Sequence, residues 1–196
     1  MKEIVIDIET VPYNKNDEVE DIIFRKKKTI ENIKFCSLNK EFGEIVCIGC
    51  NINGFDLVFY KKSEYNILKD FSKMLYKFNN QKIKLITFNG KKFDIPFIIF
   101  RCIINEINLP FKLETKRYYT NLHFDIFEVL TNFYQTQTFF TLKDYCKIFN
   151  IKNDDKDNGK DVYSLYIQKE FESIKNHCIS DVKCTKEIYE KIKNYY

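Results

Sequence analysis

The chain has 196 residues, 44% of them hydrophobic, which is enough for one compact domain with a sizeable core, and we expect a single domain over residues 1–196. No apolar run approaches the roughly 20 residues that cross a bilayer and no signal peptide precedes the first apolar stretch, so we expect a cytosolic protein without membrane contact. The net charge of +4 is modest, and it neither indicates nor excludes a large basic surface for nucleic acid.

The first predicted element is a strand that begins with the apolar run Ile4-Val5-Ile6 and leads into Asp7-Ile8-Glu9-Thr10. Side chains at positions i and i+2 of a strand point the same way, so Asp7 and Glu9 lie on one face. Two like charges this close together are stabilised by a cation, and Mg²⁺ or Mn²⁺ suits oxygen ligands. Taken alone, the same pattern also fits the solvated end of a strand.

Two more strands and a helix are expected after a charged segment. This segment runs from about Asn14 to Phe35, and its role stays open. Strands follow at Ile45 to Ile52 and Leu57 to Tyr60, joined by the turn residues Asn53-Gly54, and a helix runs from about Tyr65 to Phe78. Hairpin strands followed by strands that alternate with helices indicate an α/β chain with a mixed sheet.

The seven cysteines mostly lie within apolar runs, which predicts reduced core residues. Cys47 and Cys50 have the spacing of half a zinc site. No second pair follows them and both lie in a strand pattern, so we do not expect zinc there.

A second acidic position lies at the start of a predicted helix. Lys84 to Phe88 indicates a buried strand, Asn89-Gly90 a turn, and Phe93 to Phe100 the beginning of a helix with Asp94 near its N-terminus. An aspartate at this place has an ordinary use, because it can cap the helix or complement its dipole.

The C-terminal part of the chain supplies the last candidates. A loop through Leu109-Pro110 leads to a short strand or turn from His123 to Phe127, in which His123 and Asp125 share a face. In the helical pattern that continues to the C-terminus, His177 and Asp181 stand one turn apart on the same face, which also fits an ordinary surface pair.

Three motifs thus follow one another along the chain: Asp7-Ile8-Glu9-Thr10, Asn89 to Asp94, and His177 four residues before Asp181. This order resembles the DEDD superfamily of 3′–5′ exonucleases and, more narrowly, the predicted 3′–5′ exonucleases related to the proofreading domain of family-B DNA polymerases. That branch normally has tyrosine where this chain has His177, and the sister branch with histidine usually places it five residues before the aspartate. The role of His177, as a general base or as a residue that orients water, therefore stays open.

The resemblance implies the ribonuclease H-like fold, an α/β architecture with a mixed central sheet and helices on both faces. In this fold the first three strands form a meander and the acidic residues meet at one end of the sheet. Further similar stretches extend over much of the chain: Leu38 to Ile48, Phe88 to Phe97, Leu122 to Asp125 and Gly159 to Val162.

Four carboxylates together can hold two divalent ions, Mg²⁺ or Mn²⁺, which bind the attacking water and the leaving 3′-oxygen of a phosphodiester. We expect Asp7 to bridge the two ions, and Glu9 and Asp181 to complete one of them. Asp94 is expected to hold the other ion through water, and His177 to deprotonate or align the nucleophilic water.

Two residues before the C-terminal helices are expected to support this site. Asp125 resembles an additional aspartate that many members of the superfamily place near the metal site, and we expect it behind the ligands. His123 is expected to be structural or to lie behind the ligands as well.

Four residues of the first two motifs are expected to bind the substrate: Thr10, Asn89, Lys92 and Phe93. Lys91, Lys92 and Phe93 flank Asp94, where cations can follow the phosphates of a single strand and a ring can stack on a base. Another basic pair, Lys116-Arg117, has Tyr118 and Tyr119 beside it, but such runs are usually solvated faces.

The sequence therefore predicts a metal-dependent enzyme that shortens nucleic acid from its 3′ end to nucleoside 5′-monophosphates, with single-stranded DNA ends favoured as substrate. Two alternatives stay open. An RNA-processing exoribonuclease has the same chemistry, because recognition of the 2′-hydroxyl depends on a few contacts that the sequence does not locate. A binding protein on the same fold without catalysis is less well supported, since all four carboxylates are present.

Overall fold

A computed structural model of the chain describes residues 1–13, 36–138, 140–152 and 162–196. The charged segment from Asn14 to Phe35 and the Gly159-Lys160-Asp161 part of the last similar stretch lie outside these residues.

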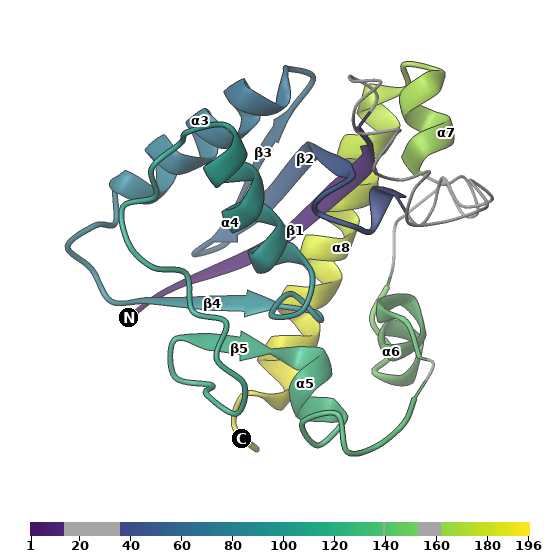
Figure 1. Cartoon of the computed structure of the whole chain (residues 1–196). Coiled ribbons are helices and arrows are strands. Elements are labelled where there is room, and N and C mark those ends of the chain that lie inside the picture. The colour runs from purple at the N-terminus through teal and green to yellow at the C-terminus, as the bar shows by residue number, and fades with distance from the viewer. Residues whose placement is uncertain (14–35, 139, 153–161) are drawn as a thin grey trace.

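Five strands form one mixed sheet in the order β3-β2-β1-β4-β5 (Figure 1). β1 (Lys2–Pro12), β2 (Gly43–Ile52) and β3 (Phe55–Tyr60) form an antiparallel meander, as predicted. β4 (Ile83–Thr87) runs parallel to β1, and β5 (His123–Asp125) runs parallel to β4. The carboxyl ends of these three parallel strands therefore meet at one edge of the sheet, where α/β folds place their ligands.

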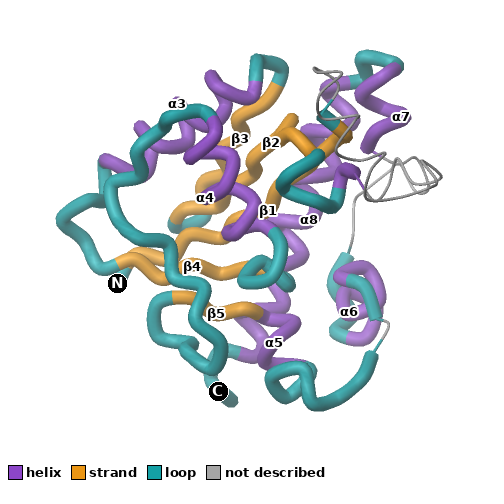
Figure 2. Tube along the Cα trace, viewed as in Figure 1, coloured by secondary structure: helices purple, strands orange, loops and turns teal. Residues whose placement is uncertain are grey.

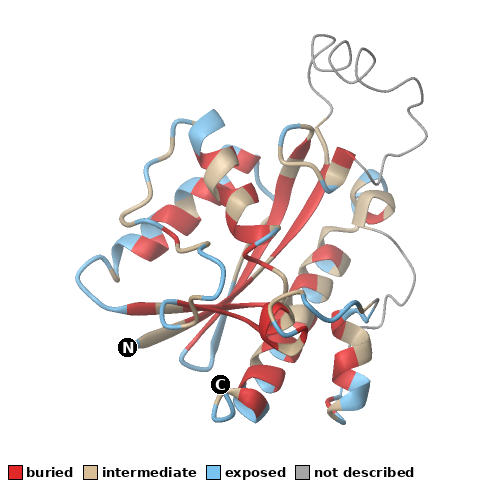
Figure 3. Ribbon diagram, turned by 60° about the horizontal axis from the view of Figure 1, so that its bottom comes forward, coloured by how far each residue is buried: buried red, intermediate tan, exposed pale blue. Residues whose placement is uncertain are grey.

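The side chains of β1 alternate between the two faces of the sheet and contribute to a hydrophobic core on each face. Ile4, Ile6 and Ile8 pack against α3 (Glu64–Tyr76) and α4 (Asp94–Ile104). Val5 and Val11 belong to the clusters on the other face, which α8 (Phe171–Ile192) covers. Figure 2 shows α3 and α4 on one side of the strands and α8 on the other. β1 and β2 are consequently buried along most of their length (Figure 3), and the predicted α/β fold with helices on both faces is confirmed.

Three shorter helices complete the described chain: α5 (Ile126–Leu130), α6 (Leu142–Ile148) and α7 (Val162–Ile167). All three contact α8. The expected strand or turn over residues 123–127 is a strand only as far as Asp125, because the Asp125 side chain accepts a hydrogen bond from the Glu128 backbone N–H and starts α5. Within the described residues, no helix has the length and apolar character needed to span a bilayer.

The two cysteines with zinc-like spacing lie three residues apart in β2 and therefore face opposite sides of the sheet. Cys47 packs in the cluster beneath α7 and α8, and Cys50 packs in the cluster beneath α3 and α4. The two thiols cannot share one ion in this arrangement.

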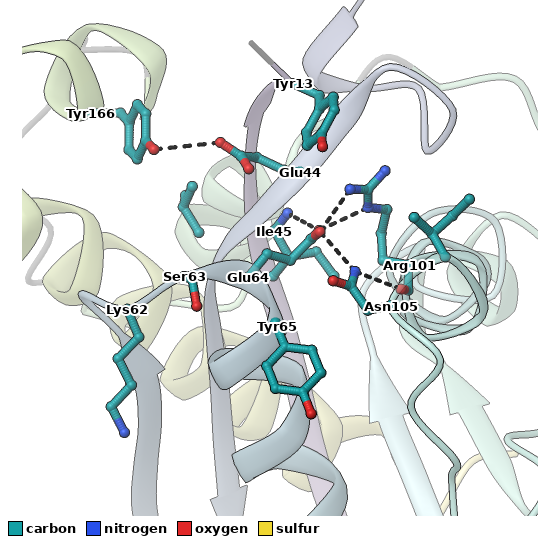
Figure 4. A pocket seen from close by; sticks show the side chains of 12 residues that line it. Tyr13, Glu44, Ile45, Lys62, Ser63, Glu64, Tyr65, Arg101, Asn105 and Tyr166 are labelled. Carbon is teal, nitrogen blue, oxygen red and sulfur yellow. Dashed lines mark hydrogen bonds and ion pairs between the residues drawn. The ribbon is translucent and has the colours of Figure 1, made fainter. Parts of the chain in front are cut away.

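A buried ion pair fixes α4 against the rest of the fold (Figure 4). The Glu64 carboxylate accepts hydrogen bonds from the Ile45 backbone N–H at 2.8 Å, from Arg101 at 2.8 and 2.7 Å, and from Asn105 at 3.0 Å. A buried pair of charges is tolerated when its remaining donors and acceptors are satisfied in this way. The pair lines a hollow of about 350 Å³ and joins β2, α3 and α4, and thereby helps to fix the helix that begins at Asp94.

Gly49 allows α8 to approach the sheet closely. A Cβ atom on Gly49 would lie 2.7 Å from Cys178 Sγ and 3.0 Å from Val182 Cγ2, which is closer than side-chain atoms pack. Cys178 and Val182 are buried on α8. Cys178 directly follows His177 in the sequence, and Val182 directly follows Asp181. The absence of a side chain at Gly49 therefore sets how near this part of α8 lies to β1 and β2.

We expect Gly49→Ala to lower the free energy of unfolding by about 1–3 kcal/mol, the usual effect of overpacking a filled core. Urea denaturation measures this change. The double variant Gly49→Ala/Cys178→Ala should lose less than the sum of the two single variants, because removal of the thiol makes room for the new methyl group. A Gly49→Ala protein as stable as the wild type would contradict the close approach of α8.

Candidate active site

β1 and α8 bring four of the predicted site residues together. Asp7 and Glu9 lie in β1 on the face that α8 covers, and His177 and Asp181 lie in the first half of α8. One donor atom each from Glu9, His177 and Asp181 lies within 4.8 Å of the others. His177 Nε2 is 3.8 Å from Glu9 Oε1, so the imidazole faces a carboxylate.

The fourth carboxylate reaches this cluster from a helix on the opposite face of the sheet. Asp94 is the first residue of α4 and is buried. Its Oδ1 accepts a hydrogen bond of 3.1 Å from the backbone N–H of Ile8, the residue between Asp7 and Glu9. Asp94 is therefore fixed on β1 itself, and its position at a helix N-terminus favours negative charge.

Burial and mutual repulsion change the acidity of two of these groups. Desolvation raises the pKa of Asp7 well above its usual range, and the negative charges of Glu9, Asp94 and Asp181 raise it further. Burial raises the pKa of Asp94 to about 7, and the charges of Asp125 and Asp181 act in the same direction. Protonation or a bound cation would relieve this repulsion.

The donor atoms suit a divalent cation that prefers oxygen. Four carboxylates and one imidazole converge here, and Mg²⁺ and Mn²⁺ are commonly held by a few carboxylates together with substrate phosphate. A cation would also remove the repulsion that raises the pKa of Asp7 and of Asp94. The residues present therefore fit such an ion.

A thiol also lies at this cluster. Donor atoms of Asp7, Glu9 and Cys178 lie within 4.8 Å of one another, and the Cys178 Sγ–H donates to the Asp7 backbone carbonyl at 3.6 Å. Sequence reasoning treated Cys178 as an ordinary core residue. The sequence signal for its place at the cluster is its position three residues before Asp181, because residues three apart on a helix share a face.

Asp125 supports the turn that precedes Asp94. It is fully buried, and its two carboxylate oxygens accept hydrogen bonds from the backbone N–H groups of Asn89 and Lys91, both at 2.8 Å. Burial raises the pKa of Asp125 even though these backbone bonds act against it. Asp125 thus joins the end of β5 to the loop between β4 and α4.

His123 lies inside the fold and connects three segments. Its Nε2 is 2.8 Å from Thr87 Oγ1, and its Nδ1 is 2.5 Å from the backbone carbonyl oxygen of Glu114. Burial lowers the pKa of His123 to about 4, so this imidazole is neutral at physiological pH. It acts as a structural hydrogen-bonding group between β4, β5 and the preceding loop.

The four residues expected to bind substrate have different surroundings. Thr10 is buried and its Oγ1 donates to the Ser37 carbonyl at 2.6 Å. Phe93 is half-buried and its ring packs edge-on against Phe97, with centroids 5.5 Å apart. Asn89 and Lys92 lie in the loop before Asp94, and of the four only Lys92 is exposed.

The expectation that Lys91 follows the substrate backbone is wrong. Lys91 is 6% exposed, and its ammonium group forms an ion pair with the fully buried Glu128. The ammonium also donates to the Tyr119 carbonyl at 3.2 Å. Two adjacent lysines look alike in the sequence, but here one neutralises a core carboxylate and only Lys92 is available at the surface.

The mixed sheet, with its acidic site at the carboxyl ends of parallel strands, has the ribonuclease H-like fold. The structure of the family B DNA polymerase from the hyperthermophilic archaeon Pyrobaculum calidifontis shares it, with a TM-score of 0.68 and 15% sequence identity over 98% of this chain. The aligned region covers 24% of the polymerase chain, so this chain spans about a quarter of that protein. At this identity the likeness concerns the fold alone.

A family described as predicted 3′–5′ exonucleases related to the exonuclease domain of PolB matches residues 48–195. This range is most of the sequence, and the chain belongs to that family. The matched range contains Asp94, His177 and Asp181, whereas β1 with Asp7 and Glu9 precedes it. A search of curated proteins finds no match.

The raised pKa of Asp94 predicts that the metal-free protein loses stability as pH rises. The folded state, with a pKa of about 7, binds this proton more tightly than the unfolded chain. The resulting stabilisation is complete below the unfolded pKa of about 4 and is lost as pH rises through about 7, at up to about 1.4 kcal/mol per pH unit. We expect Asp94→Asn, which cannot ionise, to gain stability relative to wild type over this window.

Urea unfolding in chelator across this pH range measures the difference. Glu187→Gln, which removes an exposed carboxylate from the outer side of α8, is the matched control and should follow the wild type. Parallel curves for Asp94→Asn and wild type would show that Asp94 ionises normally in the folded protein.

Proposed function

We propose that the protein is a metal-dependent 3′–5′ exonuclease that acts on single-stranded 3′ ends, with DNA favoured, and releases nucleoside 5′-monophosphates. The observation that carries the proposal is the convergence of Asp7, Glu9, Asp94 and Asp181, from two faces of the sheet, on one stretch of β1. Repelling carboxylates are unfavourable without a cation, and a phosphodiester supplies the other ligands that such a cation takes. Membership of the predicted exonuclease family supports the same chemistry.

Each residue has a role that follows from its place. Two Mg²⁺ or Mn²⁺ ions, when bound, supply an activated water and charge neutralisation at the phosphate. Asp7, Glu9 and Asp181 would hold them from the α8 side, and Asp94 from the α4 side. His177, beside Glu9 and one-fifth exposed, can accept a proton or orient water at the open side of the cluster.

The proposal includes the wider setting of the enzyme. Residues 1–196 would form one exonuclease domain, whose partner is nucleic acid and not a membrane. We place the enzyme in the cytoplasm, and the seven free, buried cysteines support this choice because reducing compartments keep thiols free.

Incubation with 5′-labelled single-stranded DNA, duplex DNA and RNA tests the activity, each with Mg²⁺, Mn²⁺ or chelator. We expect a ladder that shortens from the 3′ end, release of nucleoside 5′-monophosphates, and no reaction in chelator. Asp7→Ala and Asp94→Ala should abolish turnover, and Glu187→Ala on the outer face of α8 should retain it. Activity that survives chelation, cuts within a circular single strand, or more than about a tenth of the wild-type rate in both variants would place the chemistry elsewhere.

The place of His177 next to Glu9 predicts that its replacement slows turnover. His177→Ala should be slower by ~10²–10⁴, the usual effect of losing a group that transfers a proton or orients water. His177→Tyr should keep part of the activity, because a tyrosine hydroxyl can orient water but is a poor base at neutral pH. Steady-state rates of the two variants at saturating metal measure this difference. A His177→Tyr enzyme with the wild-type rate would show that the histidine only orients water.

A further inference from the structure

Two exposed cations and two tyrosine rings, one exposed and one half-buried, lie at the loop that leads to Asp94. Lys92 Nζ is 3.3 Å from the ring centre of Tyr134, and Arg117 Cζ is 5.0 Å from the same ring. Arg117 also lies 5.2 Å from the ring centre of Tyr118, which is 59% exposed. We call Lys92, Arg117, Tyr118 and Tyr134 the aromatic platform. Its residues come from three separate loops of the chain.

The backbone at the platform and beside it is strained. Tyr118, Asn132, Phe133 and Tyr134 all have left-handed backbone angles, with φ of 64°, 48°, 57° and 66°. Each such residue costs of order 1 kcal/mol or more, and strain of this kind concentrates where function requires a fixed geometry. Hydrogen bonds maintain the turn: the Phe133 N–H donates to the Glu128 carbonyl at 2.6 Å, and Arg117 donates to the Phe133 carbonyl at 2.7 Å.

The platform is joined to the active-site loop. The Tyr134 hydroxyl donates to Asn89 Oδ1 at 3.4 Å, and Asn89 is in turn held by Asp125. Lys92 lies two residues before Asp94, in the same loop as Asn89. A strand of nucleic acid that reaches the carboxylates from the β5 side of the sheet therefore meets the platform first.

The chemistry of the platform fits such a strand. Within the described part of the chain, neither Lys92 nor Arg117 forms an ion pair with a carboxylate, in contrast to Lys91, which Glu128 neutralises. Two cations near an exposed ring match the alternation of phosphates and bases in single-stranded nucleic acid, where stacking and phosphate contacts share the binding energy.

We propose that the aromatic platform binds the single-stranded substrate on the 5′ side of the scissile phosphate, with Tyr118 stacked on a base and with Arg117 and Lys92 on phosphates. Tyr134 positions the two cations between its ring and the strand. This inference rests on the proposed exonuclease function, and it adds a binding site for nucleotides that are not cleaved.

Two substrates separate the platform from the catalytic carboxylates. One is a twelve-nucleotide thymidine oligomer, and the other is the p-nitrophenyl ester of thymidine 5′-monophosphate, which is too short to reach beyond the cleaved bond. We expect Arg117→Gln and Tyr118→Leu to lower kcat/KM for the oligomer at least tenfold more than for the ester, mainly through KM. Lys73→Gln, which removes an exposed cation on α3, is the control and should leave both substrates unaffected.

Binding of the oligomer in chelator gives a second readout that needs no catalysis. Fluorescence anisotropy should show roughly five- to tenfold weaker binding for either variant, and Arg117→Gln should reduce the salt dependence of log Kd by about 0.7 for one lost phosphate contact. The proposed role of the platform would be contradicted if both variants kept the wild-type affinity and salt dependence. It would also be contradicted if kcat/KM fell equally for the two substrates. A wild-type protein that hydrolyses neither substrate would overturn the proposed function. The binding measurement would then still show whether the platform binds single-stranded nucleic acid.

Discussion

Mutual repulsion among the carboxylates of Asp7, Glu9, Asp94 and Asp181 is the constraint around which the rest of the structure is arranged. The repulsion adds to desolvation in raising the pKa of Asp7, and it contributes to the pKa of about 7 at Asp94. A chain free to relax would move such groups apart or turn them to solvent. Their proximity therefore has to be imposed by packing elsewhere, and a bound cation would turn the same arrangement into a favourable one.

Three features of the scaffold impose this arrangement. Gly49 lets α8 lie close against β2, which holds the helix that carries His177 and Asp181. The Glu64–Arg101 pair joins α4 to β2 and α3, and Asp125 holds the loop that precedes Asp94. None of these groups needs to touch a substrate. Each contributes by limiting the freedom of an element that ends at the site, which is the preorganisation that charge-stabilising sites require.

In the proposed enzyme, the edge of the sheet that carries the carboxylates also carries the aromatic platform on which a strand of nucleic acid would lie. Asp125 supports both the carboxylates and this surface, because it holds the loop that contains Asn89 and Lys92 and that leads into Asp94. The two neighbouring lysines of this loop have different surroundings. Lys91 neutralises Glu128 inside the fold, and Lys92 lies at the surface against Tyr134. Substrate binding and metal binding are thus coupled through one short segment in the proposed enzyme.

The sequence by itself determined the elements and the direction of their acidic side chains. The two-residue period of a strand places Asp7 and Glu9 on one face, the helical spacing places His177 beside Asp181, and Asn53-Gly54 forms the predicted turn of the β2–β3 hairpin, with left-handed angles of 51° and 93°. The motif order further identified the family, and with it the sheet topology. Only the tertiary structure decided which of two adjacent lysines is buried, that Cys178 lies against Asp7, and that Tyr134 joins Lys92 and Arg117. The physical reason is that local spacing fixes where a side chain points within its own element, whereas burial and pairing depend on what distant segments of the chain bring to meet it.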